Sequence, residues 1–406
     1  MARAAVVASL SEKPMQVGLS QRHLPSLDGL RGLAILLVLV HMLNQLEGQH
    51  GFIAACFGLV AVLGWTGVQL FFVLSGFLIT GILLDSREAE NYYSSFYARR
   101  TLRIFPLYFA VLGIAFLLLP ALGTVPDSIA HDQAQQIWLW TYTENWATAF
   151  GHGSKAFPHF WSLAVEEQFY LIWPFLLHRQ TAKKCLTLCI VLAVVSLLSR
   201  VLLIALDTPD ISIYVNSFCR MDALVLGGAA AAAFRIPALN ARLLATRDKW
   251  LLWALLAAAV GFLLTRGFDH HSWFGATAGY TIVSLVFVMF LISAVAAETG
   301  AMAGSSTESP AFHNRMWLLL LRSRVLRTFG KYSYGIYIFH KPLNDFVGKP
   351  ALKALGLPVA EFLLLNLGYI FVMSSMTFAL AYLSYHCFEK HFLAMKRLYP
   401  PMPRTT

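Results

Sequence analysis

Charged residues are scarce in this sequence of 406 residues. Asp, Glu, Lys and Arg make up 13% of the chain, whereas soluble domains carry about 25% of these residues. Apolar residues make up 58%, which a soluble protein could hide only in an unusually large core. Lipid, by contrast, tolerates apolar surface everywhere. The sequence therefore predicts an integral membrane protein.

Motifs that identify several other classes of protein are also missing. The cysteines form no CxxC pair, the histidines lack HExxH and Cys/His spacing, and no Gly-rich nucleotide-binding loop is present. We therefore predict no metal site. The net charge of +10 does not predict nucleic-acid binding, because the basic residues lie between apolar runs and not among the aromatics of a soluble module.

Apolar runs long enough to cross a bilayer recur along the chain. The predicted fold is an all-α, polytopic bundle of about ten transmembrane helices, at 30–46, 62–84, 103–122, 160–178, 186–206, 213–234, 250–266, 275–297, 328–347 and 359–388. A cytoplasmic N-terminal segment at 1–24 precedes the transmembrane domain at 25–392, and a cytoplasmic tail follows at 393–406. The first span lacks a signal-peptide cleavage site, so we expect a retained signal anchor.

The distribution of Lys and Arg predicts the orientation of these spans. With the N-terminus inside, the cytoplasmic segments carry 24 of these residues and the outer loops carry four. Both termini are therefore predicted to be cytoplasmic. Counting 138–146 as a further span would turn every later basic loop outward, so we expect an outer interfacial or re-entrant element there. The Ser- and Gly-rich stretch 298–314 is predicted to be a flexible linker.

The first span carries two ionisable residues. His41 follows Arg31 by ten positions, or about 15 Å along a helix, which is near the middle of the bilayer. An ionisable side chain at that depth is a candidate functional residue. The alternatives are a neutral His41 bonded to a neighbouring helix and an Arg31 that only anchors the cytoplasmic end.

Two further arginines precede the third span. Arg100 and Arg103 are three positions apart, so they share one face of a helix. Two guanidinium groups on one face suit phosphate groups. The predicted orientation places them at the cytoplasmic mouth of the bundle, and their alternative role is to set that orientation.

Two carboxylates enter the fourth predicted span. Glu166 and Glu167 must be protonated, hydrogen-bonded or paired with a cation, because ionised groups in an apolar span are expensive. Acid–base or orienting work is one interpretation. A structural pair with Arg200 or Arg220 is the other.

Other polar residues also lie within predicted spans. Arg220 and Asp222 are two positions apart, so they point in different directions, and each is predicted to have its partner on another helix. His340 lies well inside the ninth span. Gly76 and Thr80, four positions apart, are predicted to let two helices pack closely.

Taken in order, six sequence blocks resemble those of the membrane-bound acyltransferase 3 family. They are LDGLRG (27–32), LFFVLSGFLI (70–79), RRTLRIFP (99–106), WSLAVEEQFY (161–170), RMDAL (220–224) and GKYSYGIYIFH (330–340). The resemblance implies O-acylation, usually O-acetylation, of cell-surface glycans, glycolipids or secreted metabolites. It also implies an acyl-CoA donor, acetyl-CoA for O-acetylation, and a location in the bacterial cytoplasmic membrane.

Two positions depart from the family's pattern. Family members usually have ten residues between the arginine and the histidine, whereas nine separate Arg31 from His41. A separation of ten positions turns the two side chains about 80° apart on a helix. Either the helix is distorted near Gly29 or Gly32, or Arg31 does not face His41. In addition, Gln69 stands where many members carry Asp.

The resemblance and the residues together predict one polar chamber. The catalytic residues are predicted to be His41 and Glu167, with His41 as a general base or as the first acceptor of the acyl group. Acyl-CoA is predicted to bind at Arg31, Arg100 and Arg103. Candidates for the chamber and the acceptor site are Trp161, Ser162, Glu166, Arg220, Asp222 and His340.

The predicted partners are membrane lipid and a glycan or glycolipid acceptor. Two other functions are compatible with the same residues. One is a transporter or flippase that moves a polar substrate past the buried charges. The other is acylation of a secreted metabolite instead of a glycan.

Overall fold

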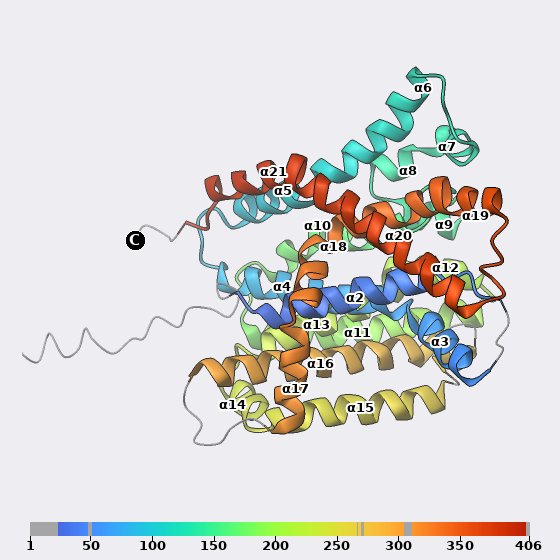
Figure 1. The fold of residues 1–406 in the computed structure, drawn as a ribbon. Coiled ribbons are helices and arrows are strands. Elements are labelled where there is room, and N and C mark those ends of the chain that lie inside the picture. Colours follow the sequence, from blue (N-terminus) through green and yellow to red (C-terminus); the bar gives the residue numbers. More distant parts are fainter. Residues whose placement is uncertain (1–22, 48–50, 266, 269–271, 304–310, 403–406) are drawn as a thin grey trace, which may run out of the picture.

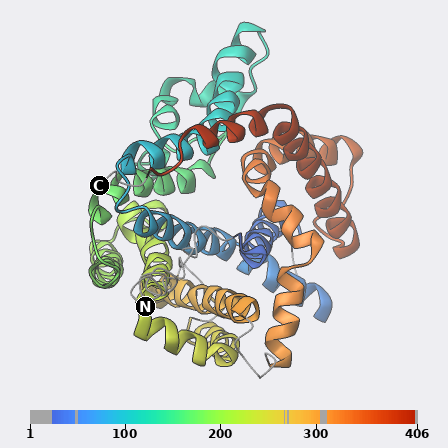
Figure 2. The same ribbon diagram turned by 90° about the vertical axis from the view of Figure 1, so that its left-hand side faces the viewer.

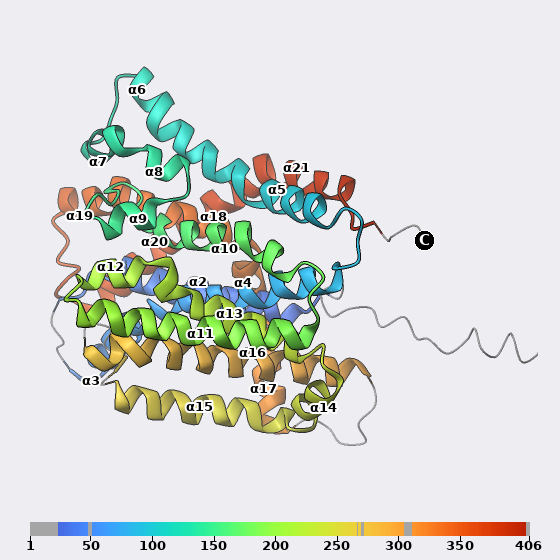
Figure 3. The ribbon, with the colours of Figure 1, turned by 180° about the vertical axis from the view of Figure 1, so that it is seen from behind.

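A computed structural model of the protein describes residues 23–47, 51–265, 267–268, 272–303 and 311–402. Every regular element within these residues is a helix, as the apolar runs predict. Most of the longer helices lie side by side in one bundle, which Figures 1 and 3 show from opposite sides.

Helices occupy all ten predicted spans, although their ends differ from the predicted ones. They are α2 (Pro25–Leu43), α4 (Thr66–Asp85), α5 (Tyr92–Gly113), α10 (Phe160–Leu177), α11 (Ala182–Ala205), α13 (Ser217–Ala233), α15 (Arg247–Leu264), α16 (Tyr280–Ala303), α18 (Arg324–Leu343) and α20 (Leu363–Ser384). Shorter α-helices and single π or 3₁₀ segments (η) connect or extend them: α3 (Phe52–Leu63), η2 (Ile114–Leu118), α6 (Leu119–Ala121), α7 (Asp127–Asp132), η3 (Gln133–Gln135), α8 (Ile137–Trp140), α9 (Glu144–Ala149), α12 (Asp210–Val215), α14 (Pro237–Ala245), η4 (Gly275–Gly279), α17 (Phe312–Leu321), η5 (Asn344–Gly348), α19 (Lys349–Leu355), η6 (Tyr385–Glu389), α21 (Lys390–Ala394) and η7 (Met395–Leu398).

Several of these helices are suited to cross a membrane. Six segments of the described chain are long and apolar enough, or seven if the sharply bent pair formed by α13 and α14 is counted as one span. Helices α10, α15 and α18 are not among them, because each contains several charged or polar residues. The chain is therefore a multi-pass membrane protein, while the count of ten crossings stays a prediction.

The two ends of the described chain lie on one side of the bundle. Helix α2 begins, and the last described residues end, at the same end of the long helices (Figure 1). Figure 2 views the molecule from that end, with many of the helices seen along their axes. Termini on one side require an even number of crossings. That this side faces the cytoplasm remains a prediction.

The first helix begins and ends earlier than predicted. Its first residue is Pro25, a position where proline is favoured because the amide that it lacks has no partner inside the helix. The helix ends at Leu43, so His41 lies in the last turn and not in the middle of the span. The predicted segment 1–24 lies outside the described residues except for its last two positions.

The predicted linker at 298–314 is wrong at its start, because α16 continues to Ala303. Glu298 is fully buried and pairs with Arg322, whose Nε and Nη2 donate to Oε1 at 3.0 and 2.7 Å. The backbone N–H of Ser26 donates to Oε2 at 3.1 Å. This carboxylate therefore joins the ends of three helices. Residues 304–310 lie outside the described residues.

Glycines allow two pairs of helices to touch through their backbones. Helix α2 crosses α18 where a Cβ added to Gly32 would lie 1.9 Å from the carbonyl oxygen of Leu326. Helix α4 crosses α13 where a Cβ on Gly76 would lie 1.7 Å from the carbonyl oxygen of Leu224. The predicted close packing at Gly76 is confirmed. These contacts bring α2, α4 and α18 together around the site described below.

The predicted outer element is built from helices too short to cross a bilayer. Helices α8 and α9 have four and six residues, whereas a crossing needs about 20. Buried carboxylates hold the segment together. The oxygens of Asp132 accept hydrogen bonds from the N–H groups of Lys155 and Ala156 at 2.9 Å, and Glu144 accepts one from the N–H of Ser154 at 2.6 Å.

We expect Gly32→Ala to lower the melting temperature of the purified protein in detergent. The added methyl group must push α2 away from α18, and such overpacking costs about 1–3 kcal/mol. Gly368→Ala in α20 is the matched control, because a Cβ there meets nothing within 4 Å. Equal melting temperatures for the two variants would contradict the proposed close contact.

We also expect the stability of the outer element to depend on pH through Glu144. Burial raises the pKa of this carboxyl to about 7, so the folded protein holds the proton more tightly than the unfolded chain. Its contribution to stability is complete below a pH of about 4.5 and is lost as the pH rises through about 7. Melting temperatures at pH 5 and pH 8 should differ less in Glu144→Gln than in the parent protein. An unchanged difference would exclude this carboxyl as the cause.

Candidate active site

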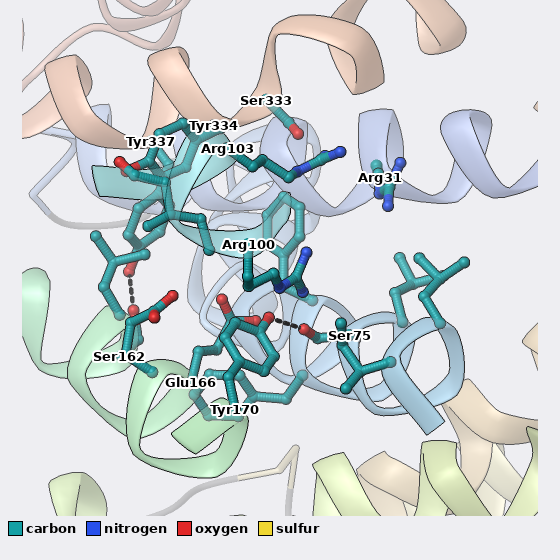
Figure 4. Close-up of a pocket in the computed structure, with 18 of the residues that line it drawn as sticks. Arg31, Ser75, Arg100, Arg103, Ser162, Glu166, Tyr170, Ser333, Tyr334 and Tyr337 are labelled. Carbon is teal, nitrogen blue, oxygen red and sulfur yellow. Dashed lines mark hydrogen bonds between the residues drawn. The ribbon is translucent and has the colours of Figure 1, made fainter. Parts of the chain in front are cut away.

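A cavity of about 190 Å³ lies between α2, α4, α5, α10 and α18. Figure 4 shows polar side chains from all five helices around it. The polar lining residues are Arg31, Ser75, Arg100, Arg103, Ser162, Glu166, Glu167, Tyr170, Ser333, Tyr334 and Tyr337. The apolar ones are Val68, Phe71, Phe72, Leu74, Leu78, Ile79, Ile82, Ile104 and Leu163. An enclosed space with convergent polar groups is the usual form of a small-molecule site.

Three arginines from two helices line one part of this cavity. Arg31 forms an ion pair with Asp28, one turn earlier on α2, at 3.3 Å. Arg100 lies over the ring of Tyr170, with 4.1 Å between the guanidinium carbon and the ring centre. Neither Arg100 nor Arg103 has an ion pair with a carboxylate of the described residues, and the Nε of Arg100 is buried without a hydrogen-bond partner there. This part of the cavity is therefore ready to receive an anion.

Carboxylates and hydroxyls line the neighbouring wall. Glu166 and Glu167 lie on α10, and Oε1 of Glu167 is buried with no hydrogen-bond partner in the described chain. The hydroxyl of Tyr337 bonds to Oγ of Ser162 at 2.5 Å (Figure 4). The predicted alternative, a structural pair between these carboxylates and Arg200 or Arg220, is therefore not observed.

His41 is not among the residues that line this cavity. Its Nδ1 lies 2.8 Å from the carbonyl oxygen of Ala61 in α3. A carbonyl only accepts hydrogen bonds, so Nδ1 carries a proton, and in the neutral imidazole the lone pair is on Nε2. A Cβ on Gly64 would lie 2.6 Å from the Cβ of His41, and Val68, four positions later, lines the cavity. His41 therefore packs against Gly64, four positions before the cavity residue Val68.

The helix that carries Arg31 and His41 is continuous, so the second of the two predicted alternatives holds. No distortion occurs at Gly29 or Gly32 within α2. Arg31 faces the cavity and His41 faces α3. The offset of about 80° that follows from a ten-residue separation accounts for these different neighbours.

Arg220 and Asp222 have partners on other helices, as predicted, and neither lines the cavity. Nη2 of Arg220 donates to Oε1 of Gln69 at 2.7 Å, so an amide takes the place of the family's usual Asp. Asp222 accepts hydrogen bonds from Nη2 of Arg200 at 3.0 Å and from the hydroxyl of Thr281 at 2.7 Å. These pairs join helices in the interior of the bundle.

Aromatic rings surround the guanidinium group of Arg220. Its carbon lies 4.4 Å from the ring centre of Tyr280, 4.9 Å from Tyr214, 5.6 Å from Trp161 and 5.9 Å from Trp65. Cation–π attraction stabilises a cation in such a position. Trp161 therefore belongs to this cage and is not among the residues that line the cavity.

His340 is also outside the cavity. It is fully buried, with Nδ1 at 2.7 Å from the carbonyl oxygen of Tyr337 and its ring 4.8 Å from the ring of His159. Of the predicted chamber residues, the structure thus brings Ser162, Glu166 and Glu167 together with the three arginines. The other predicted chamber residues do not line the cavity; they are Trp161, Arg220, Asp222 and His340.

Sequence analysis missed several residues of the cavity. Tyr170 lies four positions after Glu166, so helical spacing contains a signal for it. The contact between Ser162 and Tyr337 joins residues that are 175 positions apart, and no local pattern predicts it. A second cavity of about 180 Å³ lies across Arg100, Glu167 and Tyr170, which line both spaces.

Comparison with known proteins shows the family of the chain. The sequence model of a family described as an acyltransferase domain matches residues 24–386. No solved structure matches the chain.

Three curated relatives cover most of the chain. It is 30% identical to YrhL of Bacillus subtilis over 385 residues, which are 91% of this chain and 55% of that protein. It is 27% identical to the peptidoglycan O-acetyltransferase OatA of Listeria monocytogenes over 387 residues, 91% of this chain and 56% of OatA. It is 27% identical to the O-acetyltransferase OatA of Staphylococcus aureus over 349 residues, 81% of this chain and 52% of that protein.

The chain spans about half the length of these relatives. The family model matches most of this chain, from just before α2 to a position within η6. It includes all five helices that line the cavity. The chain therefore belongs to the acyltransferase 3 family, as its six sequence blocks indicate.

Proposed function

We propose that the protein is a membrane O-acetyltransferase that moves an acetyl group from acetyl-CoA to a hydroxyl of a cell-envelope glycan. Two relatives are named O-acetyltransferases, one of them for peptidoglycan, which supports a glycan acceptor of the same class. The observation that supports acetyl-CoA as the donor is the group formed by Arg31, Arg100 and Arg103 beside a cavity. Two of these arginines lack a carboxylate partner in the described chain.

The cavity wall fits the parts of an acyl-CoA molecule. Guanidinium groups bind phosphate oxygens through paired N–H donors, so the three arginines are suited to the diphosphate. The remaining lining is largely apolar, with Phe71 and Phe72 among its residues. Such a surface suits the thioester arm, which carries no charge. In the predicted orientation the phosphates lie on the cytoplasmic side and the acyl group points into the membrane.

We propose that His41 is the catalytic base. Its Nε2 takes the proton of the acceptor hydroxyl while the hydroxyl oxygen attacks the thioester carbonyl carbon. The carbon–sulfur bond then breaks, and the thiolate of coenzyme A leaves with the proton from the imidazolium. If His41 first accepts the acyl group, the same Nε2 is the nucleophile. Either route needs the thioester arm to extend past Val68 toward Gly64.

Glu167 is the second proposed catalytic residue. Its unbonded carboxylate oxygen lies on the wall of the cavity, where it can accept a hydrogen bond from a hydroxyl-bearing ligand. Glu166 lies on the same wall, and Ser162 and Tyr337 supply hydroxyls nearby. We assign these groups to the orientation of the donor and the acceptor.

We expect Arg100→Ala and Arg103→Ala each to weaken acetyl-CoA binding by about 10- to 100-fold. This corresponds to the loss of about 1.5–3 kcal/mol from one hydrogen bond to a charged group. Titration calorimetry in detergent measures the dissociation constant directly. Arg242→Ala, in α14 and away from the cavity, is the control for a lost positive charge. If both cavity variants bind acetyl-CoA as tightly as the parent protein does, these arginines only set the orientation of the protein in the membrane.

We expect His41→Ala to abolish acetyl transfer while acetyl-CoA still binds. The reason is that the base is lost but the arginines that bind the phosphates remain. Transfer of radiolabelled acetyl groups by the purified protein measures the first property and calorimetry the second. Failure of the parent protein to transfer acetyl groups at all would favour a transporter.

His152→Ala, an exposed histidine of the outer segment, is the matched control for His41→Ala. Its rate should equal that of the parent protein. Near-normal transfer by the His41 variant would end its assignment as the base. In a separate experiment, mass spectrometry that compares cell-envelope glycans of a deletion strain and its parent would identify which hydroxyl is acylated.

A further inference from the structure

The second cavity, of about 180 Å³, lies between α5, α10 and the turn that joins α8 to α9. These elements are neighbours in both side views (Figures 1 and 3). Arg100, Glu167 and Tyr170 line this cavity and the first one. Thr101 and Thr141, which line only the second cavity, are exposed, so this space reaches the surface. A ligand in each cavity can therefore meet the other at the shared wall.

Tyr142 is fixed at the turn that closes the second cavity. Its φ is +54°, in the left-handed region that residues with side chains rarely adopt. Nε2 of Gln168 donates to its carbonyl oxygen at 2.9 Å, and its ring stacks on that of Tyr108, with 4.2 Å between the ring centres. A backbone conformation of this kind costs about 1–3 kcal/mol and persists only where the surroundings enforce it, most often at functional sites.

The hydroxyl of Tyr142 nevertheless has no hydrogen-bond partner among the described residues, although the side chain is only 7% exposed. Oε1 of Glu167 and Nε of Arg100, in the same lining, are also buried without a partner there. The hydroxyl of Tyr97, by contrast, donates to the carbonyl oxygen of Leu171 at 2.7 Å. A buried polar group left unpaired costs about 1–3 kcal/mol. Three such groups in one lining therefore point to a ligand that pairs them.

Hydroxyl groups match these unpaired atoms. A ligand hydroxyl can donate to the carboxylate of Glu167 and accept from the guanidinium group of Arg100, and the hydroxyl of Tyr142 can bond to it in either direction. The rings of Tyr142 and Phe105 are stacked, with 5.5 Å between their centres, and add flat apolar surface to the lining. An acyl chain would leave all three polar atoms unpaired. A saccharide, with several hydroxyls around a ring, suits both kinds of surface.

The end of the described chain fixes the beginning of α5, the helix that forms one wall of this cavity. Figures 1 and 2 show α21 and the segment after it beside α5. Oγ of Ser95 donates to the carbonyl oxygen of Tyr399 at 2.9 Å, and the side chain of Asn91 accepts from the N–H of Met402 at 2.8 Å. The predicted tail at 393–406 is thus packed against the bundle, except for its last four residues, which lie outside the described residues.

We propose that the second cavity binds the saccharide of the acceptor, an assignment that rests on the proposed function. Tyr142 and Glu167 bind its hydroxyls, and the reacting hydroxyl extends past Glu167 into the first cavity, where the thioester lies. In the predicted orientation, the turn that carries Tyr142 belongs to the outer element, whereas the donor arrives from the cytoplasm. The two substrates thus reach the shared wall from opposite faces of the membrane.

Acetyl transfer by the purified full chain to soluble disaccharide fragments of peptidoglycan tests this assignment. Tyr142→Phe should raise the KM for the disaccharide about 3- to 10-fold, as expected for one lost hydrogen bond. Its dissociation constant for acetyl-CoA, measured by calorimetry, should equal that of the parent protein. Its melting temperature should not fall, because the hydroxyl has no partner within the described chain. Tyr382→Phe, at an exposed tyrosine of α20, is the matched control and should keep the parent's KM.

Thr101→Trp fills the mouth of the second cavity from an exposed position. It should raise the KM for the disaccharide by about 10-fold or more and leave acetyl-CoA binding unchanged. Ile114→Trp, at an exposed position farther along the same helical segment and away from both cavities, should change neither value.

The parent's KM in either cavity variant would overturn the saccharide assignment and leave the proposed function standing. Weaker binding of acetyl-CoA in these variants would also overturn it, because the second cavity would then belong to the donor. If the parent protein binds acetyl-CoA but acetylates none of the disaccharides, the glycan acceptor of the proposed function fails, and the saccharide site fails with it.

Discussion

A charge buried among apolar helices needs a partner, because an unpaired ion in a medium of low polarity is very expensive. Arg200 is paired with Asp222, and Arg322 with Glu298. Arg220 is bonded to an amide and enclosed by aromatic rings. These partners come from different helices, so satisfying each charge also fixes how the helices are arranged. Nε and Nη1 of Arg220 have no hydrogen-bond partner among the described residues, so the aromatic rings are its main compensation. Arg100 and Arg103, which also lack a carboxylate at ion-pair distance in the described chain, line the cavity.

The helices could be predicted from the sequence because apolar runs are local. The ends of several helices could not be predicted, because contacts between residues far apart in the sequence determine where these helices begin and end. The sequence around Glu298 predicts the start of a polar linker. The residue is nevertheless buried, because Arg322 and Ser26 donate hydrogen bonds to its carboxylate from other helices. The predicted start of the first span, at residue 30, is likewise later than the observed start of α2 at Pro25. Gly32 and its neighbours are packed against the backbone of α18, and this contact is invisible in a local pattern.

The candidate site divides in the same way. Helical spacing placed Arg100 beside Arg103, and the cavity contains both of them. His41 and Arg220, which were assigned to the same chamber, do not line this cavity, because the depth of a residue along its helix does not tell which neighbour it faces. Gln69 illustrates the point. Its neutral side chain stands where many family members carry Asp, and its amide oxygen still accepts a hydrogen bond from Arg220.

The segment 395–402 packs against the beginning of α5, and this contact affects the order in which the protein acquires its structure during synthesis. Its bonds connect residues of α5 with residues about 300 positions later in the chain. A ribosome releases the first turns of α5 into the membrane long before their partners exist. The helices that precede this segment can thus insert and pack before its bonds form. A nascent chain would complete the contacts of the beginning of α5 only after the helices from α5 to α21 had been synthesised.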